Sequence, residues 1–276
     1  MEAESSPVAG RPAEATQPAA FFDLDNTIIR GASAFHLARA LRARGFFTTF
    51  DLIRFAVHQA RYLTFGEDLN QIATVRDRAL SIVAGRSVAE VAAIGEEVWD
   101  EVLSLRIFPG THALLREHLS AGHQVWIVTA SPVEVGELIA RRLGATGALG
   151  TVAEHKDGLY TGNLVGAMMH GKAKARAIIA LAEREGIDLS RSWAYSDSLN
   201  DVPILSTVGH AVAINPDRRL RIHARREGWP IQDFRGRRRA AARRSAQTAR
   251  WAGTAWVVSM VVRAGRRALR RRLAAG

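Results

Sequence analysis

Two pairs of carboxylates follow apolar segments at distant points of the chain. Asp23 and Asp25 lie in the stretch FFDLDNT, and Asp197 and Asp201 lie in YSDSLND. A buried carboxylate is costly unless a cation, a charge partner or hydrogen bonds compensate it. For either pair alone, capping of the following helix is an equally good explanation. If the two pairs meet, however, their oxygens suit Mg²⁺, which commonly shares its coordination shell with a phosphate.

A phosphate beside such a metal ion needs further donors. Thr129, in QVWIVTAS, offers a hydroxyl and neighbouring backbone N–H groups at a strand-to-helix turn. Lys172 and Lys174 both follow Gly171, and we favour Lys172 as the phosphate-binding cation because it begins the predicted helix. With phosphate charge neutralised, an aspartate can attack phosphorus. An acid two residues further on can protonate the leaving oxygen and then deprotonate water.

The segments that carry these residues predict strands alternating with helices. Predicted strands cover residues 19–25, 124–131, 191–201 and 210–215, with a short polar β-like region at 151–166. Predicted helices cover residues 111–122, 133–144 and 172–186. This alternation is typical of an α/β fold with a parallel sheet, whose sites lie beyond the carboxyl ends of the strands. We therefore predict a Rossmann-like core from residues 19–31 and 108–228.

The alternation is interrupted directly after the first strand. Apolar residues recur at spacings of three and four in FHLARALRARGFF, LIRFAVHQARYL and SVAEVAAIGEEVWDEVL. We predict that residues 32–107 form a helical cap inserted over the edge where the acids meet. The first 18 residues, rich in Ala, Pro, Glu and Ser, are predicted to be a disordered leader.

The net charge of +11 is concentrated at the C-terminal end. Residues 235–276 hold thirteen arginines and no acid, whereas the first 234 residues hold 25 basic and 27 acidic side chains. We predict a separate basic helical tail at residues 229–276. Its apolar stretch, WAGTAWVVSMVV, is about 18 Å long as a helix, which is short of the roughly 30 Å of a bilayer core.

Flanking arginines and two tryptophans suit a helix on an anionic membrane surface, reached through residues 235–273. Docking on the body or on a partner, and nucleic-acid binding, are alternatives, as is self-association into a homo-oligomer. The chain has no cysteine, which excludes disulfides, zinc–thiolate sites and a cysteine nucleophile. This composition fits a reducing compartment, so we predict a cytoplasmic protein with peripheral membrane association through the tail.

Four segments resemble the motifs of the haloacid dehalogenase superfamily, in the same order: FFDLDNT, IVTAS, the lysine of HGKAKA and YSDSLNDVPIL. The resemblance covers roughly residues 20–215, and the helical insert is similar to that of the phosphoserine phosphatase branch, subfamily IB. It implies that Asp23 is the nucleophile and a Mg²⁺ ligand and that Asp25 is the general acid/base, its carbonyl also binding metal. Asp197 would be the distal ligand. The implied phosphate- and substrate-binding residues are Thr129, Ala130, Lys172, Asn200 and Asp201.

The resemblance also implies where substrate choice is made. Related phosphoserine phosphatases carry a cap glutamate about nine residues after the nucleophile, but here that position is Ala32, with Ser33 beside it. A cap arginine for the substrate carboxylate is matched by Arg76, although a solvated helix face explains this residue as well. We expect a phosphomonoester hydrolase for a small metabolite such as phosphoserine. The alternatives are a phosphatase of a phospholipid or lysolipid phosphate, and a non-catalytic binding protein with the same fold.

Overall fold

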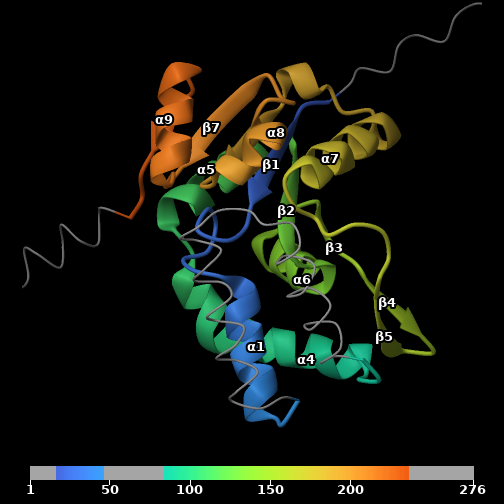
Figure 1. The fold of residues 1–276 in the computed structure, drawn as a ribbon. Coiled ribbons are helices and arrows are strands. Elements are labelled where there is room, and N and C mark those ends of the chain that lie inside the picture. Colours follow the sequence, from blue (N-terminus) through green and yellow to red (C-terminus); the bar gives the residue numbers. More distant parts are fainter. Residues whose placement is uncertain (1–16, 47–83, 236–276) are drawn as a thin grey trace, which may run out of the picture. The chain divides into compact units, whose positions relative to one another are not determined.

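The computed structural model describes residues 17–46 and 84–235 and contains a six-stranded parallel sheet (Figure 1). The strand order is β3-β2-β1-β6-β7-β8, and every neighbouring pair is parallel. The strands are β1 (Ala19–Asp23), β2 (Gln124–Pro132), β3 (Gly147–Thr151), β6 (Trp193–Ser196), β7 (His210–Ile214) and β8 (Ile231–Gln232). The predicted α/β fold with a parallel sheet is confirmed.

Helices connect the strands of this sheet. They are α5 (Pro109–Ser120), α6 (Val133–Leu143), α7 (Lys172–Glu185), α8 (Val202–Leu205) and α9 (Arg218–Arg226). Helix α6 ends at Gly144 and α7 at Gly186, both in the left-handed conformation, with φ of 72° and 65°. Glycine adopts this conformation without the steric cost of a Cβ atom, so the predicted ends of both helices follow from the sequence.

Strand β1 lies in the middle of the sheet and is buried on both faces. Its side chains alternate: Phe21 packs in a cluster with Ile178 and Leu181 of α7, while Phe22 stacks on Tyr195 at 4.3 Å. His118 of α5 contacts the Phe22 ring edge-on, so α5 covers this second face. The aromatic packing fixes β1 at the centre and places its last residue, Asp23, in the middle of the carboxyl edge.

A helical segment follows β1. It contains α1 (Ser33–Ala43) and α4 (Val88–Val98), and the chain continues through a π-helical turn (Trp99–Leu103) and a 3-10 turn (Ser104–Arg106). The two helices pack together (Figure 1). Their buried apolar residues include Leu37, Leu41, Val91 and Ile94. The predicted helix in LIRFAVHQARYL and the candidate Arg76 lie outside the described residues.

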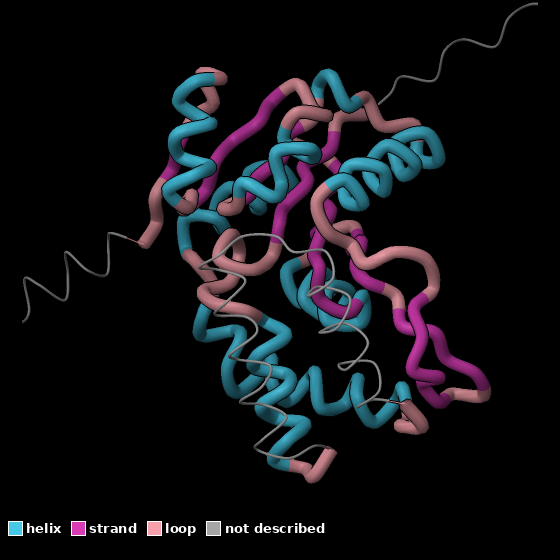
Figure 2. Tube along the Cα trace, viewed as in Figure 1, coloured by secondary structure: helices cyan, strands magenta, loops and turns pink. Residues whose placement is uncertain are grey.

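A separate two-stranded sheet projects from the main one (Figure 2). Strands β4 (Ala153–Lys156) and β5 (Leu159–Leu164) pair antiparallel and lie within the β-like region predicted at 151–166. Asp157 and Gly158 join them with φ of 53° and 77°. Two successive left-handed residues are the geometry of the Asp-Gly hairpin turn. The hairpin also contacts the helical segment, because the Tyr160 N–H donates to the Arg86 carbonyl.

The core extends further toward the C-terminus than the sequence suggests. The predicted boundary at residue 228 is corrected by β8, which pairs with β7, and by Trp229 and Ile231, which pack against the core cluster. Compact units divide between Asp233 and Phe234. A strand of two residues shows no alternation, so pattern reasoning cannot detect it. The tail from residue 236 lies outside the described residues, and within those no helix has the length and apolar character to cross a bilayer.

Candidate active site

Three polar strand ends meet at the carboxyl edge of the sheet. Asp23 is the last residue of β1 and lies opposite Val128 in the register of β2, which places Thr129 one position beyond it. On the other side, Phe22 pairs with Tyr195 of β6, so Ser196 and Asp197 also reach this edge. The register of three parallel strands therefore brings together motifs that lie far apart in the sequence.

Lys174 connects two of these motifs. Its Nζ lies 2.6 Å from Asp23 Oδ1 and 2.9 Å from Asp201 Oδ2, and the lysine is only 3% exposed. Ser196 donates from its hydroxyl to the same Asp201 oxygen at 2.7 Å. A buried ion pair is maintained only when its remaining hydrogen-bonding capacity is satisfied. Here two carboxylates bind one ammonium group, and a hydroxyl binds one of those carboxylates.

The expected phosphate-binding lysine, Lys172, is not part of this cluster. Lys172 is exposed at the first position of α7, whereas Lys174 is buried on the face that also carries Ile178, Leu181 and Ala182. These positions are spaced four, seven and eight residues from Lys174, the spacing of the inward face of a helix. The apolar periodicity therefore contained the signal that Lys174, rather than Lys172, lies on the buried face of α7.

The cluster holds more carboxyl groups than basic groups. Burial raises the pKa of Asp23 to about 7, Lys174 opposes this rise and Asp201 adds to it. Burial, reinforced by Asp23 and Asp201, also raises the pKa of Asp197 well above its usual value. Burial alone would lower the pKa of Lys174, but Asp201 and Asp23 raise it, so the lysine stays charged. One lysine does not neutralise this set of acids, and an added cation would relieve the repulsion.

The donor set fits a hard cation that uses few protein ligands. Within residues 17–46 and 84–235, no group of three His, Asp or Glu side chains gathers into a metal cage. Asp23 and Asp197 nevertheless interact electrostatically at the edge of the sheet. Mg²⁺ is commonly held by one or two carboxylates, with water and substrate phosphate completing its shell. Asp23 and Asp197 are therefore suited to Mg²⁺ rather than to a metal that requires a full protein cage.

Asp25 lies beside the start of α1. The Ser33 N–H donates to Asp25 Oδ1 at 2.8 Å. Burial raises the pKa of Asp25, while hydrogen bonds from the backbone and the side chain of Ser33 lower it. A carboxyl group whose pKa is raised by burial can hold and release a proton more readily than one that is always ionised.

The carboxyl end of β2, which holds Thr129 and Ser131, is kept in place by its own hydrogen bonds. Thr129 Oγ1 accepts from the Ser131 N–H at 3.1 Å, which leaves the Thr129 hydroxyl hydrogen to donate elsewhere. The Ala130 carbonyl accepts from Thr151 Oγ1 at 2.8 Å, and Thr151 Oγ1 accepts from the Met169 N–H at 3.1 Å. These bonds fix the end of β2 against β3 and against the loop that precedes α7.

Further polar residues border the site. Asn200 lies in a 3-10 turn after β6, with its side-chain nitrogen 3.4 Å from His170 Nε2. Asn215, which sequence reasoning missed, donates from Nδ2 to the Asn26 carbonyl at 3.0 Å and supports the loop that follows Asp25. The Asp217 N–H donates to the Asp197 carbonyl at 2.8 Å. Neither of these two hydrogen bonds could be predicted from the sequence, since each joins two different loops.

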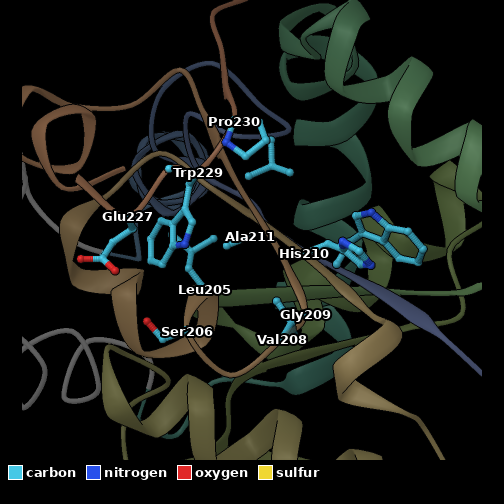
Figure 3. A pocket seen from close by; sticks show the side chains of 12 residues that line it. Leu205, Ser206, Val208, Gly209, His210, Ala211, Glu227, Trp229 and Pro230 are labelled. Carbon is cyan, nitrogen blue, oxygen red and sulfur yellow. The ribbon is translucent and has the colours of Figure 1, made fainter. Parts of the chain in front are cut away.

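A cavity of about 510 Å³ opens at the opposite edge of the sheet (Figure 3). It is lined by Trp193 and His210, the first residues of β6 and β7, and by Trp229. None of the carboxylates described above lines it. Because the strands are parallel, the amino ends that border this cavity are separated from the polar edge by the length of the strands.

Comparison with known proteins agrees with this geometry. Residues 20–206 match the family of haloacid dehalogenase-like hydrolases. The chain belongs to this family of hydrolases. Within the family it is phosphoserine phosphatase-like: it is 55% identical over 224 residues to the phosphoserine phosphatase SerB1 of Mycobacterium tuberculosis, covering 81% of this chain and 73% of that one.

Two solved structures share the fold. A protein of unknown function from Bordetella pertussis Tohama I superposes with a TM-score of 0.71 at 30% identity, over 79% of this chain and 99% of its own. A phosphoserine phosphatase that holds a phospho-aspartyl intermediate analogue gives a TM-score of 0.58 at 19% identity, over 80% of this chain and 94% of its own. At that identity the second likeness bears on the fold alone.

Proposed function

We propose that this phosphoserine phosphatase-like enzyme hydrolyses phosphomonoesters through an aspartyl-phosphate formed on Asp23. The observation that carries the proposal is the position of Lys174 at the carboxyl edge of the sheet. Its Nζ lies 2.6 Å from Asp23 and 2.9 Å from Asp201. A carboxylate nucleophile needs a neutralised phosphate, and a buried lysine beside it provides a fixed positive charge.

In the first step, a carboxylate oxygen of Asp23 forms a bond to phosphorus, and the bond from phosphorus to the leaving oxygen breaks. Asp25 gives its proton to that oxygen. In the second step, Asp25 takes a proton from water, whose oxygen attacks phosphorus and displaces the Asp23 carboxylate as phosphate leaves. Thr129 and Lys174 donate hydrogen bonds to the phosphoryl oxygens in both steps, and Asn200 is a further proposed phosphate contact.

Mg²⁺ is the cofactor that the site favours. Asp23, Asp197 and the backbone carbonyl of Asp25 would hold it, and when bound it would supply positive charge to the phosphoryl group. Asp201 serves mainly to orient Lys174, since it lies 2.9 Å from Nζ. We predict that loss of divalent cation abolishes turnover.

Asp23→Asn provides the direct test. The variant keeps the size of the side chain but removes the nucleophile, so phosphate release should fall to background on every substrate with Mg²⁺ present. Wild type should accumulate an acid-stable, alkali-labile phosphoenzyme, and the variant should not. Equal rates of release from the two proteins would reject the mechanism.

A small phosphorylated metabolite is the substrate that we favour, and phosphoserine is supported by the likeness to SerB1. Ala32 replaces the glutamate expected to hold the amino group, so a phospholipid or lysolipid phosphate is the alternative. Phosphate release from a panel containing phosphoserine, other small phosphomonoesters and lysophosphatidate separates the two. Activity confined to the lipid would reject the phosphoserine assignment.

We also propose that the helical segment at residues 32–107 acts as a cap over this edge. The start of α1 supports this role, because the Ser33 N–H bonds to Asp25. Arg76, within the same segment, is the proposed contact for a substrate carboxylate. An Arg76→Ala variant should raise KM for phosphoserine and leave KM for p-nitrophenyl phosphate unchanged; equal changes would reject this contact.

The basic tail is proposed to bind an anionic membrane surface from a cytoplasmic location. The thirteen arginines of residues 235–276 support it, at about 1 kcal/mol for each arginine near the surface. Deleting these residues should abolish sedimentation with phosphatidylserine vesicles, and unchanged sedimentation would reject the role. Binding of the full chain to RNA would identify nucleic acid as the partner. A change of oligomeric state on deletion would identify a second copy of the chain.

A further inference from the structure

Two buried hydroxyl groups join the helical segment to the carboxyl end of β2. Ser33 Oγ lies 2.9 Å from Ser131 Oγ, although 98 positions separate the two residues. Ser33 is fully buried and Ser131 is 5% exposed. Neither residue is in the catalytic set proposed above, yet each directly adjoins a member of it.

Ser33 is linked to the proposed acid/base. Its backbone N–H donates to Asp25 Oδ1 at 2.8 Å, from the first residue of α1. Its hydroxyl meets the Ser131 hydroxyl at 2.9 Å. Ser33 therefore holds Asp25 through its backbone N–H while its hydroxyl pairs with Ser131.

Ser131 is linked to Thr129, the proposed phosphate-binding residue in β2. Its N–H donates to Thr129 Oγ1 at 3.1 Å, which orients the Thr129 hydroxyl. The four residues thus form a continuous chain of hydrogen bonds from Asp25 through Ser33 and Ser131 to Thr129. This chain spans the distance between the leaving-group side and the phosphate side of the site.

We propose that Ser33 and Ser131 are positioning residues. Their paired hydroxyls hold Asp25 at a fixed position relative to Thr129, so that the Asp25 proton points at the leaving oxygen. The proposal rests on the proposed function, since it assumes that Asp25 is the general acid. The pair also connects the first helix of the cap to the chemical step, because Ser33 begins α1.

Leaving-group dependence distinguishes this role from simple packing. An alkoxide leaving group, as in phosphoserine, needs a proton when its bond to phosphorus breaks, whereas p-nitrophenolate leaves readily without one. A misplaced Asp25 should therefore slow phosphoryl transfer from phosphoserine much more than from p-nitrophenyl phosphate. The constant kcat/KM reports steps up to the first irreversible one, so the later hydrolysis, common to both substrates, does not obscure the comparison.

The experiment measures kcat/KM on both substrates, with saturating Mg²⁺, for wild type, Ser33→Ala, Ser131→Ala and the double variant. Each single change should lower kcat/KM for phosphoserine about 10- to 100-fold and that for p-nitrophenyl phosphate less than about threefold. The double variant should lose no more than the larger single loss, because both hydroxyls act through one hydrogen bond. Asp25→Asn should show the same preference more strongly.

Ser192→Ala is the matched control. Ser192 is also fully buried, but its hydroxyl accepts from the Ala19 N–H and donates to the Asp188 carbonyl at the amino end of β1. Its loss should lower the melting temperature without altering the ratio of the two kcat/KM values. Circular dichroism identifies any variant that fails to fold, and in that case the other single variant tests the proposal.

The outcomes separate the two levels of inference. Equal losses on both substrates in a folded Ser33→Ala or Ser131→Ala variant would overturn the positioning role, as would additive losses in the double variant. Absence of wild-type activity on both substrates would instead overturn the proposed function. Wild-type activity together with a preference for p-nitrophenyl phosphate in both single variants would support the positioning role.

Discussion

The ammonium nitrogen of Lys174 lies 2.6 Å from Oδ1 of Asp23, although 151 positions separate the two residues in the chain. The same nitrogen lies 2.9 Å from Asp201. This arrangement keeps a buried lysine charged at the place where a phosphoryl group would gain negative charge. A fixed charge of this kind needs no reorganisation when the reaction occurs, which is why it can lower the barrier.

Exchange of the two neighbouring lysines for methionine tests which one serves the site. Lys174→Met should reduce kcat/KM about 100- to 1,000-fold, since it removes the charge beside Asp23 and Asp201. Lys172→Met is the matched control and should stay within about twofold of wild type, because Lys172 is exposed. Steady-state kinetics on phosphoserine measures kcat/KM for both variants. A large loss of kcat/KM in Lys172→Met alone would support Lys172 as the phosphate-binding lysine.

Mg²⁺ should stabilise the folded protein more strongly at higher pH. Burial raises the pKa of Asp23 from 3.8 to about 7, so the unfolded chain binds fewer protons than the folded one between these values. The free energy of unfolding of the metal-free protein should therefore fall as pH rises through this range, as far as Asp23 determines it. Bound Mg²⁺ relieves the ionised carboxylates, and the rise in melting temperature should be larger at about pH 8 than at about pH 5.

Asp197→Asn should remove most of this response to Mg²⁺, because it takes away the proposed distal ligand. Asp157→Asn is the control: Asp157 is an exposed turn residue in the left-handed conformation, which asparagine also adopts. Thermal unfolding with and without Mg²⁺ measures both. A full Mg²⁺ response in Asp197→Asn would contradict the proposed metal site.

His118 should make the protein sensitive to acid. Burial, with a smaller contribution from His123, lowers the pKa of His118 from 6.5 to about 4, and its Nε2 lies 2.8 Å from the Tyr195 hydroxyl. Between these pH values the unfolded chain binds a proton that the folded protein does not. The free energy of unfolding should therefore fall as pH drops from about 6.5 to 4.

Urea unfolding at several pH values, compared between wild type and His118→Gln, isolates this effect from that of other groups. The variant should be less stable at neutral pH but should lose less stability on acidification. His155→Gln, at an exposed hairpin position, should follow the wild-type curve. Parallel curves for wild type and His118→Gln would show that His118 does not determine the acid response.

Truncation tests the end of the core. A chain that stops after Asp233 keeps β8 and should retain phosphatase activity and nearly the wild-type melting temperature. A chain that stops after Gly228 loses β8 together with the packing of Trp229 and Ile231, and should lose about 2 kcal/mol or more of stability. Thermal unfolding and phosphate release measure both chains. Equal stability of the two would place the boundary at 228, as the sequence suggested.

Much of the fold was predictable because its elements have strong local patterns. Apolar residues dominate the strand Ala19–Asp23 and the first part of Gln124–Pro132, and helices α6 and α7 end at Gly144 and Gly186. Strand β8 was missed because two residues have no period. The position of Arg76, and of the helix predicted in LIRFAVHQARYL, lies outside the described residues and stays a prediction.

By itself, the sequence determined which residue types can do chemistry and at which strand ends they lie, since alternation and apolar runs are local properties that any reader of the chain can measure. Only the tertiary structure decided that Lys174, rather than Lys172, reaches Asp23, and that Ser33 meets Ser131. Such pairings depend on the rotation of a helix about its axis and on the approach of segments about a hundred or more positions apart. Both are set by how the apolar faces pack, and no single segment contains that information.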